Sequence, residues 1–250
     1  MARQRTPEGP PPPPPVQKLR IRYARRSRLR FSSSRDFARS LERALRRAAV
    51  PMAYSAGFHP HPRISYAGGA PTGAASEAEY LEISLAERVD PDSVRAALDA
   101  ALPAGLDIIE VVEAGPGSLA ERLEASEWRI ELPGVATGVA ESAVAAFLGV
   151  AEAPVRRMFK TGEKTLDARG PVVSMAIGPG SDDHCAILQV VVRHTTPSVR
   201  PDDILTALRA VAALPMPVPA RVTRLAQGPL TGAGAGVADP LATDKEAVGT

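Results

Sequence analysis

The sequence predicts an α+β protein built from two ferredoxin-like β-α-β-β-α-β subdomains, with an apparent internal duplication and disordered termini. Two observations favour this fold. Segments with strand alternation and segments with helical periodicity follow one another in the same order in both halves of the chain. In addition, the stretch from 89 to 116 resembles the stretch from 199 to 229. One continuous mixed sheet is the alternative.

The internal resemblance begins with matching helix starts. VDPDSVRAALDA begins at Val89 and VRPDDILTALRA begins at Val199. Each copy places proline at the first helical turn, continues as an amphipathic helix, stops at a Leu-Pro pair and is followed by a strand. Because the chain is rich in Ala and Leu, coincidence between two helix–strand units is the competing explanation.

The periodicity of apolar residues and the positions of turn residues predict the helices and strands of each half. In the first half we expect strands at 18–24 and 28–32, a helix at 35–49, strands at 51–55, 62–67 and 78–86, a helix at 91–102 and a strand at 106–113. In the second half we expect a strand at 127–132, a helix at 137–149, strands at 154–161, 171–178 and 185–194, a helix at 201–213 and a strand at 219–226. The expected regions are a disordered proline-rich tail (1–16), a basic subdomain (17–116), a second subdomain (117–230) and a disordered tail (231–250).

Composition excludes several classes of protein. No stretch approaches the roughly 18 apolar residues of a membrane span. The N-terminus has Arg3 and Arg5 followed by prolines instead of an apolar segment, so it does not read as a secretory signal. The single cysteine, Cys185, can neither form a disulfide within the chain nor hold an iron–sulfur cluster alone. We expect a cytoplasmic protein.

Charge is distributed very unevenly. The segment from 18 to 63 carries 13 Lys and Arg residues against two acidic ones, whereas the segment from 64 to 250 carries 15 basic and 25 acidic residues. Such a division predicts a positive face for a polyanion. A solvated basic face is the alternative, and high-GC codon usage would also favour arginine.

The arginines occur on the first predicted strands and helix, in KLRIRYARRSRLRFSSSRDF and the residues that follow. Serine at 33 or 34 is expected to cap that helix, where unpaired N–H groups can bind a phosphate. Arginine suits this role because its planar fork binds phosphate bidentately and stacks on bases. The candidate phosphate-binding residues are Arg22, Arg26, Arg30, Arg39 and Arg43.

The segment AYSAGFHPHPRISYAGGAPTG (53–73) places two histidines two residues apart, each followed by proline. Residues two apart in extended chain point the same way, so we expect a stiff, exposed loop with both imidazoles facing one cleft. A recognition loop, a purely structural crossover and a metal site are all compatible with it, although GFHPHPRIS contains no Cys, Asp or Glu. The candidate binding residues are Tyr54, Gly57, Phe58, His59, His61 and Arg63, with Gly73, Ser76 and Glu77 after them.

The run from 23 to 83, with GFHPHPRISYA, PTG and SEAEYLEI, resembles the uncharacterised bacterial radical-SAM-linked proteins, a domain of unknown function. The resemblance covers about residues 16 to 226. It implies an accessory role beside a radical SAM enzyme, encoded separately or fused, and the family's gene neighbourhoods suggest RNA as substrate. It implies no catalytic residues, and this chain has no CxxxCxxC motif. S-adenosylmethionine and the iron–sulfur cluster are therefore expected only in the partner.

These observations lead to one expected function and two alternatives. We expect a non-catalytic accessory protein that binds RNA, ribosomal or transfer, through the arginines and the GFHPHP loop. One alternative is an RNA-processing or RNA-modifying enzyme that uses His59 and His61 as an acid–base pair. The other is a scaffold only. No membrane partner is expected, and the sequence leaves the oligomeric state open.

Overall fold

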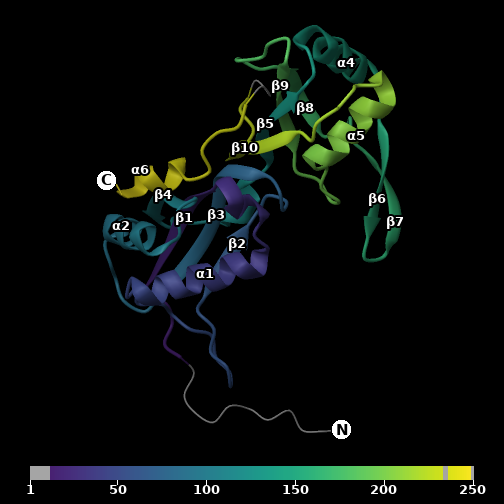
Figure 1. Ribbon diagram of the computed structural model, residues 1–250. Coiled ribbons are helices and arrows are strands. Elements are labelled where there is room, and N and C mark those ends of the chain that lie inside the picture. The colour runs from purple at the N-terminus through teal and green to yellow at the C-terminus, as the bar shows by residue number, and fades with distance from the viewer. Residues whose placement is uncertain (1–11, 233–235, 249–250) are drawn as a thin grey trace, which may run out of the picture. The chain divides into compact units, whose positions relative to one another are not determined.

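The computed structural model describes residues 12–232 and 236–248 (Figure 1). The expected proline-rich tail lies outside these residues as far as position 11. The chain forms two compact units. Unit 1 comprises Met1–Gly69, Glu79–Leu119 and Leu241–Thr250, and unit 2 comprises Ala70–Ala78 and Ala120–Pro240. The division near residue 119 lies close to the expected boundary, but residues 70–78 and the C-terminus belong to the other unit.

Unit 1 is a mostly antiparallel sheet with helices. Its elements are β1 (Gln17–Arg25), the 3-10 helix η1 (Ser27–Phe31), α1 (Ser34–Arg47), β2 (Ile64–Ala67), most of β3 (Ala75–Leu85), α2 (Pro91–Ala101), β4 (Leu106–Glu113) and α6 (Ala242–Val248). The strand order is β4-β1-β3, and β2 pairs with the later part of β3. The β1–β4 and β2–β3 pairs are antiparallel.

The core of unit 1 follows from the alternation in β1. Leu19, Ile21 and Tyr23 are buried and pack with Leu41 of α1 and Leu98 of α2. Both helices contribute to this one cluster, so they cover the same face of the sheet (Figure 1). Helix α1 begins where the Ser33 side chain accepts a hydrogen bond from the backbone of Asp36, as expected for an N-cap.

The expected strand at 28–32 is wrong, because Ser27–Phe31 form a 3-10 helix. Strand β1 already lies between β4 and β3, so neither of its edges is free to pair with a following strand. After β1 the Arg26 N–H donates to the carbonyl of Gly105, and Ser27 adopts a left-handed conformation with φ of 50°. The arginines expected on a hairpin tip therefore lie on a compact helical turn.

Unit 2 is also a mostly antiparallel sheet with helices. Its elements are the start of β3, α3 (Leu119–Arg122), β5 (Ala125–Pro133), α4 (Thr137–Gly149), β6 (Pro154–Phe159), β7 (Gly162–Asp167), β8 (Val172–Ile177), β9 (Cys185–Arg193), α5 (Pro201–Ala212) and β10 (Arg221–Gly228). The strand order is β10-β5-β9-β8, and every pair in it is antiparallel. The start of β3 adds to β10 as a parallel strand at Thr223 and Ala75.

Helices α4 and α5 lie side by side and share the core of unit 2 with its sheet (Figure 1). Phe147 of α4, Leu208 of α5 and Leu188 of β9 are fully buried in this core. The strand expected at 154–161 is present as β6, and a second strand that was not expected, β7, follows it. Among the described strands β6 and β7 pair with each other as a hairpin, and Gly162 begins β7 with φ of 108°. A left-handed conformation of this kind favours glycine.

The expectation of a disordered tail from 231 is wrong for residues 236–248. Leu230 and Val237 form a β-bridge, and Ala242–Val248 form α6. Asp244 is 0% exposed and accepts two hydrogen bonds from Arg20, at 2.7 and 2.9 Å. The small, polar composition gave no sign of this, because the stabilising partner lies 224 residues away in the sequence.

The described chain is thus a mixed α+β fold with mostly antiparallel strand pairing. None of its described helices is both long and apolar enough to cross a membrane.

Candidate functional site

Helix α1 separates apolar from cationic residues. Its buried positions are Phe37, Leu41, Ala44 and Leu45. Five arginines occupy its exposed positions, and we call them the α1 arginine face: Arg35, Arg39, Arg43, Arg46 and Arg47. The 3.6-residue period produces this division, because residues three and four apart share a side of a helix. The sequence alone predicted this division of the helix surface. It also predicted two of the five arginines, Arg39 and Arg43, as binding residues.

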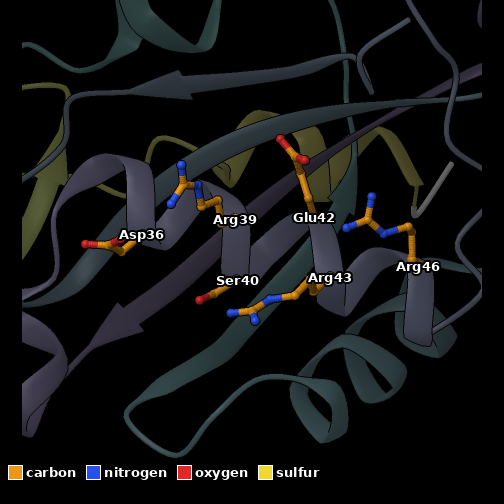
Figure 2. Close-up of a pocket in the computed structure, with 6 residues that line it drawn as sticks. All are labelled: Asp36, Arg39, Ser40, Glu42, Arg43 and Arg46. Atoms are coloured by element: carbon orange, nitrogen blue, oxygen red, sulfur yellow. The ribbon is translucent and has the colours of Figure 1, made fainter. Parts of the chain in front are cut away.

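A shallow hollow of about 370 Å³ runs along this helix. Asp36, Arg39, Ser40, Glu42, Arg43 and Arg46 line it (Figure 2). Figure 2 shows Arg39, Glu42 and Arg46 pointing to one side of the helix, and Arg43 to the other with Ser40. Asp36 is engaged at the helix start, where its carboxylate accepts from the Ser33 hydroxyl at 2.7 Å. No arginine of the α1 arginine face forms an ion pair with any described residue.

The arginines before α1 have different surroundings. Arg22 is half-buried and lies opposite Glu110 of β4. Arg26 forms an ion pair with Asp107, at 2.6 Å between Nη1 and Oδ2. Arg30 stacks over the ring of Phe31, 4.7 Å from its centroid. Each therefore already has a structural neighbour, which distinguishes these three candidates from Arg39 and Arg43.

The loop from 53 to 63 is an irregular hairpin. Tyr54 and Pro62 form a β-bridge, and the Ser55 N–H donates to the carbonyl of His61 at 2.9 Å. The His61 N–H in turn donates to the Ser55 hydroxyl at 3.1 Å. Gly57 turns the chain with φ of 133°, and no atom crowds the position that its Cβ would occupy. Hydrogen bonds across its base hold this loop at residues 55 and 61.

Both histidines of the loop are exposed, and so are Phe58, at 60%, and Arg63. His61 lines a cavity beside α1, and His59 is not among the residues that line this cavity. The prediction assumed one regular extended segment. The chain instead has bends through residues 56–59, so alternation does not hold across the first histidine.

Three candidate residues after the loop belong to unit 2. Ser76 is fully buried, and its hydroxyl accepts from Arg224 Nε at 3.3 Å. Gly73 lies in a turn with φ of 96°, and Glu77 is half-buried on β3. The hydroxyl of Ser76 is therefore used inside unit 2. The candidate site consists of residues of unit 1 alone.

Sequence reasoning missed two groups of residues. The first is Glu42 and Arg46, which their spacing from Arg39 on the same helix could have revealed. Glu42 lies near the ring of Tyr66: burial, and next the charge of Glu42, raise the pKa of Tyr66 to about 12. The second group is a buried polar cluster in unit 2, where Arg224 contacts Gln227 and the ring of Trp128. No local pattern signals that cluster.

The same cluster region contains His194. Its ring nitrogens lie 2.7 Å from the Ser126 hydroxyl and 2.7 Å from the carbonyl of Leu123. Burial lowers the pKa of His194, and the hydrogen bond with Leu123 opposes this effect. Its neighbours hold both ring nitrogens, as expected for a structural histidine. Across residues 12–232 and 236–248, no three His, Cys, Asp or Glu side chains are grouped so that they could hold a metal ion.

Comparison with protein families gives one match. Residues 18–201 match the family described as "Uncharacterized protein conserved in bacteria (DUF2344)". The chain belongs to this family. A comparison with curated proteins finds no match. Among solved structures, the encapsulated DyP-type peroxidase from Mycobacterium smegmatis aligns over 88% of this chain and 94% of its own, with 11% identity and a TM-score of 0.21.

Proposed function

We propose that this protein is a non-catalytic accessory protein that binds single-stranded RNA through the α1 arginine face. The observation that carries the proposal is that five exposed arginines on one helix form no ion pair with any described residue. Arg20, Arg26 and Arg30, in contrast, have acidic or aromatic neighbours within the same unit. Unpaired guanidiniums on a rigid element suit a chain of phosphates.

The geometry of the helix supports phosphate binding at more than one point. Arg39, Arg43 and Arg46 follow one another at intervals of four and three residues, and all three line the hollow along α1, with Arg39 and Arg46 on one side of the helix and Arg43 on the other. Each planar fork can hold a phosphate bidentately. The loop beside the helix adds Phe58 and His59, whose exposed rings can stack on unpaired bases. Helix α1 can thus contact the phosphates of the RNA backbone, and the neighbouring loop can contact its bases.

The partner and location are further parts of this proposal. The resemblance to radical-SAM-linked proteins supports a radical SAM enzyme as partner and a cytoplasmic site of action. S-adenosylmethionine and an iron–sulfur cluster would then be bound by that enzyme, because a cluster needs several cysteine ligands and this chain has one cysteine. The reaction performed on the RNA would belong to the partner.

We infer too that the two units are copies of one ferredoxin-like unit. The order β4-β1-β3 with β2 beside β3 matches the order β10-β5-β9-β8, element for element along the chain. The helices α2 and α5, which begin with Pro91 and Pro201, occupy corresponding positions. The hairpin β6–β7 is an addition in the second copy. A crystal structure in which the strands and helices of the two units superpose in this order would support the inference, and units that do not superpose would contradict it.

Fluorescence anisotropy with single-stranded RNA tests the binding proposal. The double variant Arg39→Glu/Arg43→Glu should reduce affinity at least 30-fold at about 50 mM salt, because two phosphate contacts become repulsive. Arg95→Glu/Arg209→Glu is the matched control, with the same charge change on α2 and α5, and should retain most of the affinity. Undetectable RNA binding by the wild type, or equal effects of the two double variants, would contradict the proposal.

The enzyme and scaffold alternatives give different results. If His59 and His61 were an acid–base pair, the purified protein would process RNA alone, and His59→Ala or His61→Ala would abolish turnover. A scaffold would tolerate both histidine variants and the Arg39→Glu/Arg43→Glu variant while it still captured its partner. The placement of His61 but not His59 at a cavity favours binding over paired catalysis.

A further inference from the structure

A second hollow of unit 1 lies between the C-terminal part of α1 and the loop from 53 to 63. It is a cavity of about 170 Å³, and it is more enclosed than the hollow along α1. Glu42, Leu45 and Arg46 of α1 form one side, and Tyr54 and His61 of the loop form the other. The two hollows share Glu42 and Arg46, so the cavity is continuous with the α1 arginine face.

The lining of this cavity combines apolar side chains with the polar groups of Glu42, Arg46 and His61. Leu45 and Met52 are buried beneath it, with Val50 beside them. Pro60 and Pro62 complete the wall, and proline has no N–H to donate. The hydrogen bonds between Ser55 and His61 hold this wall in place. A cavity that combines aromatic rings from Tyr54 and His61, apolar side chains and a few polar groups suits a flat ring that can form hydrogen bonds.

The volume limits what can enter. An apolar cavity of about 150 Å³ holds one benzene molecule in another protein. A cavity of about 170 Å³ therefore accommodates one six-membered ring. A purine has a second fused ring and exceeds this space. A sugar and phosphate would remain outside, where Arg46 lies in both hollows and can hold the phosphate.

Glu42 determines which six-membered ring fits best. An ionised carboxylate only accepts hydrogen bonds. Cytosine presents an N4 amino donor, which pairs with Glu or Asp side chains, whereas uracil presents a carbonyl oxygen at the same position. Uracil would place two acceptors against each other, and cytosine would gain a charge-assisted hydrogen bond.

We propose that this cavity binds one unpaired cytosine of single-stranded RNA, with Glu42 accepting from the N4 amino group. The inference rests on the proposed RNA binding and names the base that the site selects. Tyr54 and His61 contribute ring faces, and the α1 arginine face binds the flanking phosphates. The cavity thus adds base selection to a surface that otherwise reads only the backbone.

Anisotropy measurements with ten-nucleotide RNAs of cytidine, uridine or adenosine test this proposal on the full chain. The wild type should bind the cytidine oligomer about tenfold more tightly than the uridine oligomer, as expected for one hydrogen bond to a charged group. Glu42→Gln should reduce that preference to within about twofold, because an amide both donates and accepts. Glu141→Gln on the exposed side of α4 is the matched control and should leave the preference unchanged.

Each of the other outcomes contradicts a specific part of the proposal. Equal binding of cytidine and uridine oligomers, with binding still lost in Arg39→Glu/Arg43→Glu, overturns the cavity proposal and leaves the proposed function intact. Tighter binding of the adenosine oligomer overturns the size argument and with it the proposal. No binding of any oligomer overturns the proposed function and the cavity proposal together. A preference that survives Glu42→Gln overturns the role of Glu42.

Discussion

Strand β1 and helix α1 lie close together in the sequence and are both rich in arginine, yet Arg20 of β1 and the arginines of α1 have opposite surroundings. Arg20 of β1 is 1% exposed and contacts both Asp244 and Glu82. The α1 arginine face is exposed and forms no ion pair with any described residue. A central strand has neighbours on both edges and both faces, whereas a surface helix buries one stripe. Charge counted along a sequence therefore overstates the charge offered to a ligand.

The largest expected effect comes from breaking the buried pair of β1. Asp244→Leu should lower the free energy of unfolding by about 3–5 kcal/mol, because the buried Nη1 of Arg20 loses both carboxylate oxygens that accept from it. Urea unfolding followed by circular dichroism measures it. Lys245→Met is the control, because it breaks the more exposed pair with Glu110 and should cost about 1 kcal/mol or less. Equal losses in both variants would contradict the assigned role of Arg20.

The second prediction is that the arginines of α1 contribute to RNA binding but not to the stability of the fold. Neutralising Arg39, Arg43 and Arg46 to glutamine should leave the free energy of unfolding within about 0.5 kcal/mol of the wild type. The slope of log affinity against log salt should fall by roughly 2, since each lost phosphate contact on a single strand removes about 0.7. Titrations with RNA at several salt concentrations measure this slope. A large stability loss would show that these side chains support the fold.

A smaller effect concerns the start of α1, on which the direction of the arginines depends. Ser33→Ala should lower the free energy of unfolding by about 1 kcal/mol, because the backbone N–H of Asp36 loses its acceptor. Ser34→Ala is the matched control, since Ser34 is the first residue of the helix and does not cap it. Thermal or urea unfolding distinguishes the two. Equal effects would place the helix start elsewhere.

The smallest effect distinguishes Arg26 from the α1 arginine face. Its pair with Asp107 is partly exposed, so Arg26→Gln should change the free energy of unfolding by less than about 1 kcal/mol. RNA affinity should fall less than in Arg39→Gln, because Arg26 already has a partner. Parallel anisotropy titrations of the two variants measure the difference. A greater loss in Arg26→Gln would extend the RNA surface onto η1.

Local patterns were sufficient for most elements. The helix expected at 137–149 and the strand expected at 106–113 have the bounds that the structure shows. The cap at Ser33 and the cationic side of α1 depend only on residues within one or two turns. Such features could be predicted because the determining contacts are close in sequence.

Other elements depend on contacts that no local pattern contains. The strand expected at 28–32 failed because β1 already had two neighbours, which only the sheet topology reveals. Helix α6 was missed because its stabilising partner is Arg20, at the other end of the chain. The candidate site likewise contains residues that local patterns predict and residues that they do not predict. Arg39 and Arg43 followed from helical spacing, whereas the cavity at Glu42 requires Met52 and His61 to meet α1 in space.

The last residues of the chain have a consequence for its synthesis. Unit 1 contains both the first strand and Leu241–Thr250, so the ribosome finishes all of unit 2 before unit 1 can close. Until then the growing chain carries the Arg20 guanidinium without Asp244, on a sheet face that α6 has not reached. Unit 1 therefore gains the partner of its buried arginine only after the residues of unit 2 have been synthesised.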